Sequence, residues 1–201
     1  GDRLKLLSID QWGTNKWNNM RSAFAGAENM DVKATDTPDL SQTTDLSWMF
    51  IGNKSLRGET ANWNWDTSNI TKMSGVFQNA EQFNQNIGVW DVSNVSDTSS
   101  MFNGAISFNN GGSDSIANWE TSNLVIANDM FRKAASFNQP IGAWDMKKVQ
   151  FLVRFLSDAT SFNQSLAAWR LDSLVILPGK PLSGAAAALD HTAISRQNYD
   201  A

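Results

Sequence analysis

The chain repeats itself about every 25 residues, and this repeat limits the fold more than any other feature of the sequence. Segments 83–107 and 137–161 are both 25 residues long and share the letters FNQ, IG and WD at matching places. With the tryptophan before the acidic residue as position zero, units begin at Trp12, Pro38, Trp65, Trp90, Trp119, Trp144 and Trp169. Units of this size cannot each bury an apolar face alone, so the repeat predicts a stack of coils that cover one another.

The apolar pattern inside each unit predicts an α/β solenoid with a mixed coil. Apolar residues recur 2, 5, 12 and 18 positions after zero, with a small residue at 15, and this spacing matches neither a long helix nor a long strand. We expect one short parallel strand and one short helical or 3₁₀ segment per repeat. The whole chain, 1–201, is then one solenoid domain, with an N-terminal cap and divergent first repeat (1–37), central repeats (38–168) and a degenerate last repeat with a cap (169–201).

Composition excludes several classes of function. The chain has 16 Lys and Arg against 20 Asp and Glu, and no basic run longer than a pair, so it lacks the positive surface that nucleic acids require. It has no Cys and one His, which excludes thiol nucleophiles and histidine or thiolate metal clusters. We expect no enzymatic activity, no cofactor and no metal. No apolar run reaches the length of a transmembrane helix, so we expect no membrane insertion by this segment. We also expect the segment to be monomeric within a larger chain.

Polar residues also recur in rows. An asparagine follows the second phenylalanine of several units (Asn84, Asn109, Asn138, Asn163), where it can bond turn backbone groups that no sheet partner reaches. An acidic residue follows position zero (Asp39, Asp66, Asp91, Glu120, Asp145), and this row is either a cation site or a set of turn caps. The insertion at 109–115 is either a calcium loop using Asp114 or an ordinary surface loop.

The tryptophans at position zero raise the question of function. Strand alternation counted from the isoleucine three positions earlier puts these rings on the outer face, as an aromatic platform. A row of exposed indoles is an apolar patch that soluble monomers rarely carry, and core packing is the ordinary role of periodic aromatic residues. Both orientations stay open for Trp65, Trp90, Trp119, Trp144 and Trp169.

Two tryptophans outside this row are stronger binding candidates. Trp48 occupies a slot that other units fill with polar residues or glycine, and Trp63 stands between Asn62 and Asn64. An exposed indole beside amide groups is typical of a sugar or peptide platform, and the alternative is local packing under the N-terminal cap. The predicted ligand-binding residues are Trp48, Trp63, Trp65, Trp90, Asn62 and Asn64. Basic residues of the fifth and sixth units either meet an acidic partner or form a solvated face (Arg132, Lys133, Lys147, Lys148, Arg154).

The repeat resembles that of the BspA-like leucine-rich-repeat family of bacterial surface proteins, which is close to GMFxxAxxFNQxIGxWDVSNVTxM. Segment 83–101 follows this pattern nearly residue for residue, segment 6–50 resembles the usual lead-in, and segment 193–201 resembles the closing cap helix. The last unit departs from it, with Arg170 in place of an acid. The resemblance implies a leucine-rich-repeat-like coil on the bacterial cell surface, extracellular, often in an adhesin.

Two functions compete. The first is a non-catalytic recognition module of an adhesin that binds a protein or carbohydrate of a host or neighbouring cell through a rigid solenoid face. The alternative is a structural spacer that holds other domains away from the envelope. A spacer is expected to have a uniformly polar skin, whereas a binder needs an exposed tryptophan or a basic patch.

Overall fold

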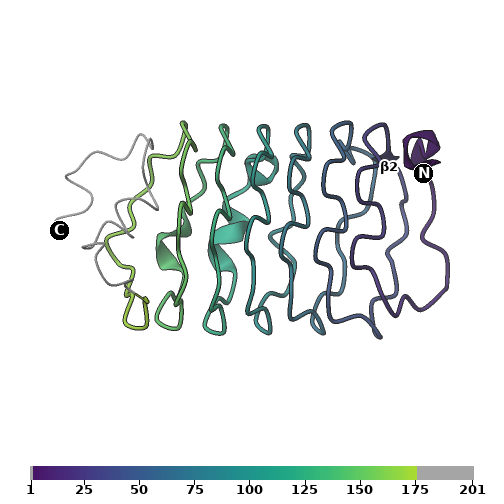
Figure 1. Cartoon of the computed structure of the whole chain (residues 1–201). Coiled ribbons are helices and arrows are strands. Elements are labelled where there is room, and N and C mark those ends of the chain that lie inside the picture. The colour runs from purple at the N-terminus through teal and green to yellow at the C-terminus, as the bar shows by residue number, and fades with distance from the viewer. Residues whose placement is uncertain (1, 176–201) are drawn as a thin grey trace.

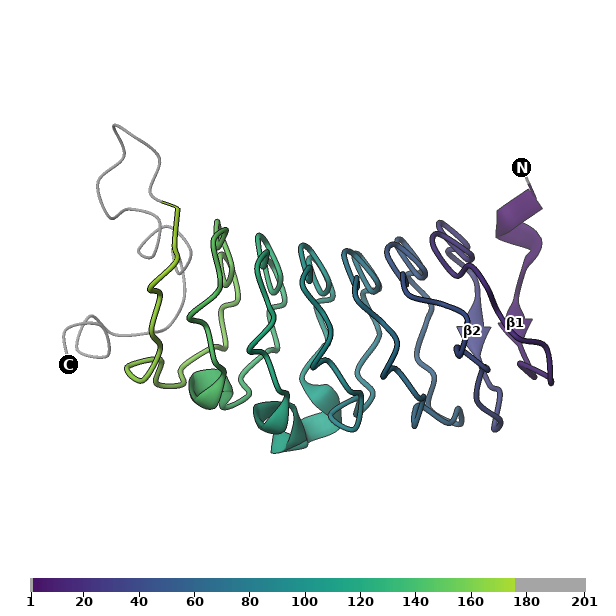
Figure 2. The ribbon, with the colours of Figure 1, turned by 90° about the horizontal axis from the view of Figure 1, so that it is seen from below.

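A computed structural model gives the fold and describes residues 2–175. Most of this segment is turns and irregular backbone, which wind through successive coils lying side by side along one axis (Figure 1). The regular elements within it are short: η1 (Asp2–Lys5), β1 (Ser8–Ile9), β2 (Asp31–Val32), η2 (Asn110–Gly112), η3 (Asp114–Asn118) and η4 (Ile141–Ala143). The later 3₁₀ helices, drawn in teal and green, lie along one edge of the stack (Figure 2).

Neighbouring coils pair in parallel. Strands β1 and β2 form a two-residue parallel ladder in which Ser8 pairs with Asp31. In the later coils the residue seven positions after zero forms an isolated parallel bridge with its equivalent, and the row runs through Asp45, Lys72, Asp97, Ile126 and Phe151. We expected a strand in every repeat, but each of these coils instead contributes a single bridge residue.

Each coil turns away from the row of parallel bridges because a residue with left-handed backbone follows the bridge residue three positions later. The tenth residue after zero has a positive φ in six successive coils: Ser22, Trp48, Gly75, Ser100, Asp129 and Arg154. In this segment alternate N–H groups donate to the next coil, as Trp48 N does to Ser74 O (2.8 Å), while intervening ones bond three residues back, as Met49 N does to Leu46 O (3.1 Å). Backbone groups thus join the coils, and outward side chains are free to differ from coil to coil.

Two phenylalanine rows fill the core. In three successive coils the rings at positions 12 and 18 stack on each other with centroids 3.8–3.9 Å apart. These pairs, all fully buried, are Phe77 with Phe83, Phe102 with Phe108, and Phe131 with Phe137. The alanine between the two positions leaves room for this approach. Each of these coils buries its aromatic rings against its neighbours.

The asparagine row forms the predicted hydrogen-bonded ladder. Asn109 N donates to Asn84 Oδ1 (2.7 Å), Asn138 N to Asn109 Oδ1 (2.9 Å) and Asn163 N to Asn138 Oδ1 (2.9 Å). Each side chain therefore satisfies a backbone donor of the following coil, which confirms the role predicted for this row.

The end of the stack is only partly described. Of the last repeat the structure describes 169–175, where Trp169 is partly buried and its Nε1 donates to Ile141 O (3.0 Å). The rest of the predicted degenerate repeat and cap, including the closing helix predicted at 193–201, lies outside the described residues. Among the helices between residues 2 and 175, none has the length and apolar character needed to cross a membrane.

Candidate functional site

The tryptophan row at position zero lies in the core. Trp65, Trp90 and Trp144 are 2–3% exposed, and Trp119 is 5% exposed. Trp65 stacks on Trp90 with ring centroids 5.4 Å apart, and the Nε1 groups of Trp65 and Trp90 donate to backbone carbonyls at 2.9 and 2.8 Å. A ligand cannot reach ring faces packed in this way. The assignment of Trp65 and Trp90 to a binding platform is therefore corrected to a role in core packing.

From Trp90 onward, the reason is the turn that precedes the ring. The N–H of the tryptophan donates to the carbonyl three residues earlier in successive coils, as Trp90 N does to Ile87 O (3.0 Å) and Trp144 N to Ile141 O (3.2 Å). A 3₁₀-type turn has three residues per turn, so positions −3 and zero share one face. Strand alternation, which places them on opposite faces, does not apply here.

Trp63 is also a core residue. It is 5% exposed, its ring stacks on Trp65 with centroids 5.1 Å apart, and its Nε1 donates to Gly58 O (3.0 Å). Asn62 uses its Oδ1 to accept the N–H of Asn64 (3.0 Å), which is a turn contact. The indole ring of Trp63 is therefore buried, and Asn62 and Asn64 form a local turn on either side of it. The platform predicted from Trp63 is not assembled, because the ring points inward.

Trp48 alone of the four predicted ligand-binding tryptophans is partly exposed. It is half-buried, and its backbone is left-handed with φ of 60°, a conformation that costs a bulky residue about 1–2 kcal/mol. The Arg21 guanidinium of the preceding coil lies over the indole, with Cζ 4.2 Å from the ring centroid. On the following coil the ring lies against Gly75, where an added Cβ would collide with it. Three coils therefore hold the ring in place.

A carboxylate fixes the cation beside this ring. Arg21 Nη1 lies 2.9 Å from Asp45 Oδ2, and Asp45 Oδ1 also accepts the N–H of Ser47 (2.8 Å). Burial opposes ionisation of Asp45, but the hydrogen bonds from Ser47 and the charge of Arg21 outweigh it and lower the pKa of Asp45. At neutral pH the surface around Trp48 thus presents an indole, a guanidinium and a carboxylate in fixed positions. The contribution of Arg21 was not predicted, because nothing in the sequence shows that it stacks on a residue 27 positions later.

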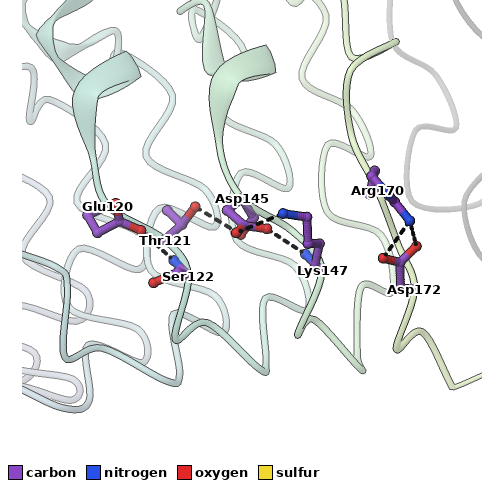
Figure 3. A network of polar contacts seen from close by, with 7 residues as sticks. All are labelled: Glu120, Thr121, Ser122, Asp145, Lys147, Arg170 and Asp172. Atoms are coloured by element: carbon purple, nitrogen blue, oxygen red, sulfur yellow. Dashed lines mark hydrogen bonds and ion pairs between the residues drawn. The ribbon is translucent and has the colours of Figure 1, made fainter.

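The acidic row at position one caps turns, which confirms that interpretation. Glu120 Oε1 accepts Ser122 N, and Asp145 Oδ1 accepts Lys147 N, both at 3.1 Å (Figure 3). In the earlier coils the Ser68 hydroxyl and N–H lower the pKa of Asp66, and Ser41 does the same for Asp39. Each carboxylate with these contacts is turned back on its own chain. Within the described residues no group of three or more His, Cys, Asp or Glu gathers where a metal ion would bind.

The insertion is a surface loop anchored by Asn110. The Oδ1 of this buried side chain accepts Ile87 N (2.9 Å), and its Nδ2 donates to Ser113 O (2.8 Å). Asp114 lies in the first turn of η3. These contacts hold the inserted residues 109–115 in an ordered surface loop.

The basic residues lie at two places on the fifth and sixth coils. Lys147 lies 3.6 Å from Asp145 (Figure 3), and Lys148 Nζ donates to Asn123 Oδ1 (2.8 Å). At the left-handed turn, Arg154 and Arg132 both approach Asp129. The basic residues are thus split between two edges of one face.

A comparison with protein families gives one match. A family model described as "Mycoplasma protein of unknown function, DUF285" matches residues 18–115 and 112–179, which together span most of the chain. No curated protein and no solved structure matches the chain.

Proposed function

We propose, for a chain that belongs to this DUF285 family, the function of a non-catalytic recognition module on a bacterial surface protein. In this proposal the coils form a leucine-rich-repeat-like solenoid of the BspA type, and the module is displayed outside the cell as part of an adhesin. Its ligand is a protein or carbohydrate of a host or neighbouring cell.

The accessible ring of Trp48 is the observation that carries the proposal. The other tryptophans of the array are buried or, as Trp17 and Trp169, partly buried and packed against the core, whereas the half-buried Trp48 has an unfavourable left-handed backbone at the surface. Other coils place serine, glycine, aspartate or arginine at this slot, so the fold does not need an aromatic residue there. Strain retained without a packing requirement is typical of a binding residue.

The surroundings of the ring favour recognition over chemistry. Arg21 and Asp45 are paired at 2.9 Å, and the backbone that carries all three residues is bonded to the neighbouring coils. Side chains on such a rigid face lose little conformational entropy when a ligand binds. An indole supplies apolar contact area, and the guanidinium supplies hydrogen-bond donors beside it.

The test is a binding screen of the purified chain on an array of glycans and of mammalian matrix and plasma proteins. We expect at least one ligand, and a loss of at least about tenfold in affinity for Trp48→Ser, since a hot-spot indole commonly carries that much. Serine is the residue that the array itself uses at this slot in Ser22 and Ser100, so folding is preserved.

The matched control is Val89→Ser, which removes another exposed apolar side chain (60% exposed) and is expected to leave binding unchanged. Absence of any ligand, or equal binding by Trp48→Ser and the unmodified chain, contradicts the proposal. That result favours the spacer function instead.

A further inference from the structure

The outer face of the parallel bridge row changes character halfway along the stack. Its side chains come from the sixth, seventh and ninth positions after zero. In the second to fourth coils, between residues 44 and 99, all of these residues are Thr, Ser, Asp or Lys. In the fifth to seventh coils these positions hold Asn128 and Gln150 together with five apolar residues, which we call the apolar strip: Val125, Ile126, Phe151, Val153 and Val175. The repeat tolerates polar residues at these positions, so the core does not require the change.

Backbone contacts bring these five residues together on three adjacent coils, with Gln150 between Val125 and Val175. Ile126 pairs with Phe151 in a parallel bridge, Gln150 N donates to Val125 O (2.9 Å), and Val175 N donates to Gln150 O (2.9 Å). Phe151, Val153 and Val175 are 39%, 48% and 46% exposed, and Val125 and Ile126 are half-buried. Exposed apolar side chains gathered on neighbouring coils in this way mark an interaction site.

Positive charge borders the strip on both sides. In the sixth coil Lys148 precedes it and Arg154 follows it. Lys148 Nζ has a neutral partner, Asn123 Oδ1, at 2.8 Å. Arg154 Nε lies 2.9 Å from Asp129 and Arg132 Nε lies 3.8 Å from the same carboxylate, so two guanidinium groups share one negative charge. Both edges therefore carry an excess of positive charge on a chain whose net charge is −4.

We propose that the apolar strip binds an extended polypeptide segment of another protein, in which apolar side chains lie between acidic residues. The charge of the two edges attracts such a segment and fixes its position. Three coils at about 4.8 Å spacing give a strip roughly 10 Å wide, which suits one or two extended chains.

The other occupants fit less well. A second copy packed on the same face brings the basic edges of both copies together, and like charges oppose this contact. Membrane-surface segments bury bulky apolar groups about 5–10 Å into the lipid boundary. In the strip the most exposed side chain is 48% exposed, so about half of its surface is already covered by the protein and is not available for insertion into lipid.

The inference rests on the proposed recognition function but uses a different surface from Trp48. Loss of binding through Trp48→Ser and loss of binding through the strip are therefore separate results.

The test is selection of a random twelve-residue peptide display library on the purified full chain, followed by measurement of the dissociation constants of the selected peptides. We expect peptides with apolar residues flanked by Asp or Glu. Their affinity is expected to fall at least about tenfold for the double variant Phe151→Ser/Val153→Ser. Lys148→Glu leaves the strip intact and is expected to weaken binding several-fold, with a smaller salt dependence.

The matched control is Val89→Ser/Ile106→Ser, which removes two apolar side chains that are 60% and 48% exposed at other positions of the coil. This control is expected to bind as the unmodified chain does. The proposal is overturned if no such peptides are selected, or if the double variant and Lys148→Glu both bind them unchanged. It is also overturned if the unmodified chain sediments with phosphatidylcholine–phosphatidylglycerol vesicles, or forms a dimer in sedimentation velocity, and the double variant Phe151→Ser/Val153→Ser does not.

Discussion

Replacing Asn53 with alanine is expected to stabilise the fold. Asn53 is fully buried, and neither its Oδ1 nor its Nδ2 has a hydrogen-bond partner. It occupies the slot between the two phenylalanine rows, where other coils place an alanine, such as Ala27 and Ala80. Burial of an amide without partners costs about 1–3 kcal/mol.

The substitution also removes packing volume. The space left by the amide, roughly 25 Å³, costs roughly 0.6 kcal/mol at about 24 cal/mol per Å³. The net gain in the free energy of unfolding is then about 1–2 kcal/mol. For a domain of this size it raises Tm by about 2–8 °C.

Urea denaturation followed by tryptophan fluorescence measures the change, with Tm from calorimetry as a second readout. The matched variant is Ala80→Asn, which puts the same amide into the equivalent slot of the next coil and is expected to destabilise the fold by more than about 1 kcal/mol. A loss of stability in Asn53→Ala, or no effect in Ala80→Asn, refutes the reasoning that this slot is apolar and dry.

Three further predictions follow from the same contacts. Trp90→Ala is expected to lower the free energy of unfolding by about 3–5 kcal/mol, because Trp90 is only 2% exposed. Trp48→Ser is expected to change the same quantity by no more than about 1 kcal/mol. Equal effects of the two substitutions in urea denaturation contradict the burial assigned to Trp90. Two backbone N–H groups lower the pKa of Asp36 below 3.8, so its ionised form stabilises the fold above about pH 4. The unmodified chain is therefore expected to be more stable than Asp36→Asn above about pH 4 and to lose this advantage as the pH falls further, which unfolding measured at a series of pH values checks. An advantage that stays constant with pH contradicts the role assigned to ionised Asp36. Asn110→Ala is expected to cost about 2 kcal/mol in thermal or urea unfolding, because Ile87 N loses its buried acceptor, and unchanged stability contradicts this anchor.

The rows of the array were predictable from the sequence because each depends on the repeat alone. An asparagine that recurs every coil next to a turn meets the same backbone donor each time, and Asn109 and Asn138 bond as predicted. Acidic residues followed by a serine two positions later cap their own turn, as Asp66 does with Ser68. These contacts are local, or they join equivalent residues of adjacent coils.

The binding candidates were less predictable, because they depend on where each ring points. Strand alternation allowed an outward Trp90, but the 3₁₀-type turn from Ile87 places both side chains on the inner face. The apolar strip was missed, although a comparison of the sixth, seventh and ninth positions across the units contains its signal: Phe151 stands where Asp97 and Lys72 stand earlier.

The sequence by itself determined the period, the order of the coils and the polar rows, since a stacked repeat brings equivalent residues together whatever the detailed backbone path. Only the tertiary structure decided which aromatic rings are buried and which surface remains for a partner. The physical reason is that a turn of three residues and a strand of alternating residues send the same side chain to opposite faces, and local sequence does not choose between them. Trp90 and Trp48 are the same residue type, but the first supports the core and the second lies at the surface beside Arg21.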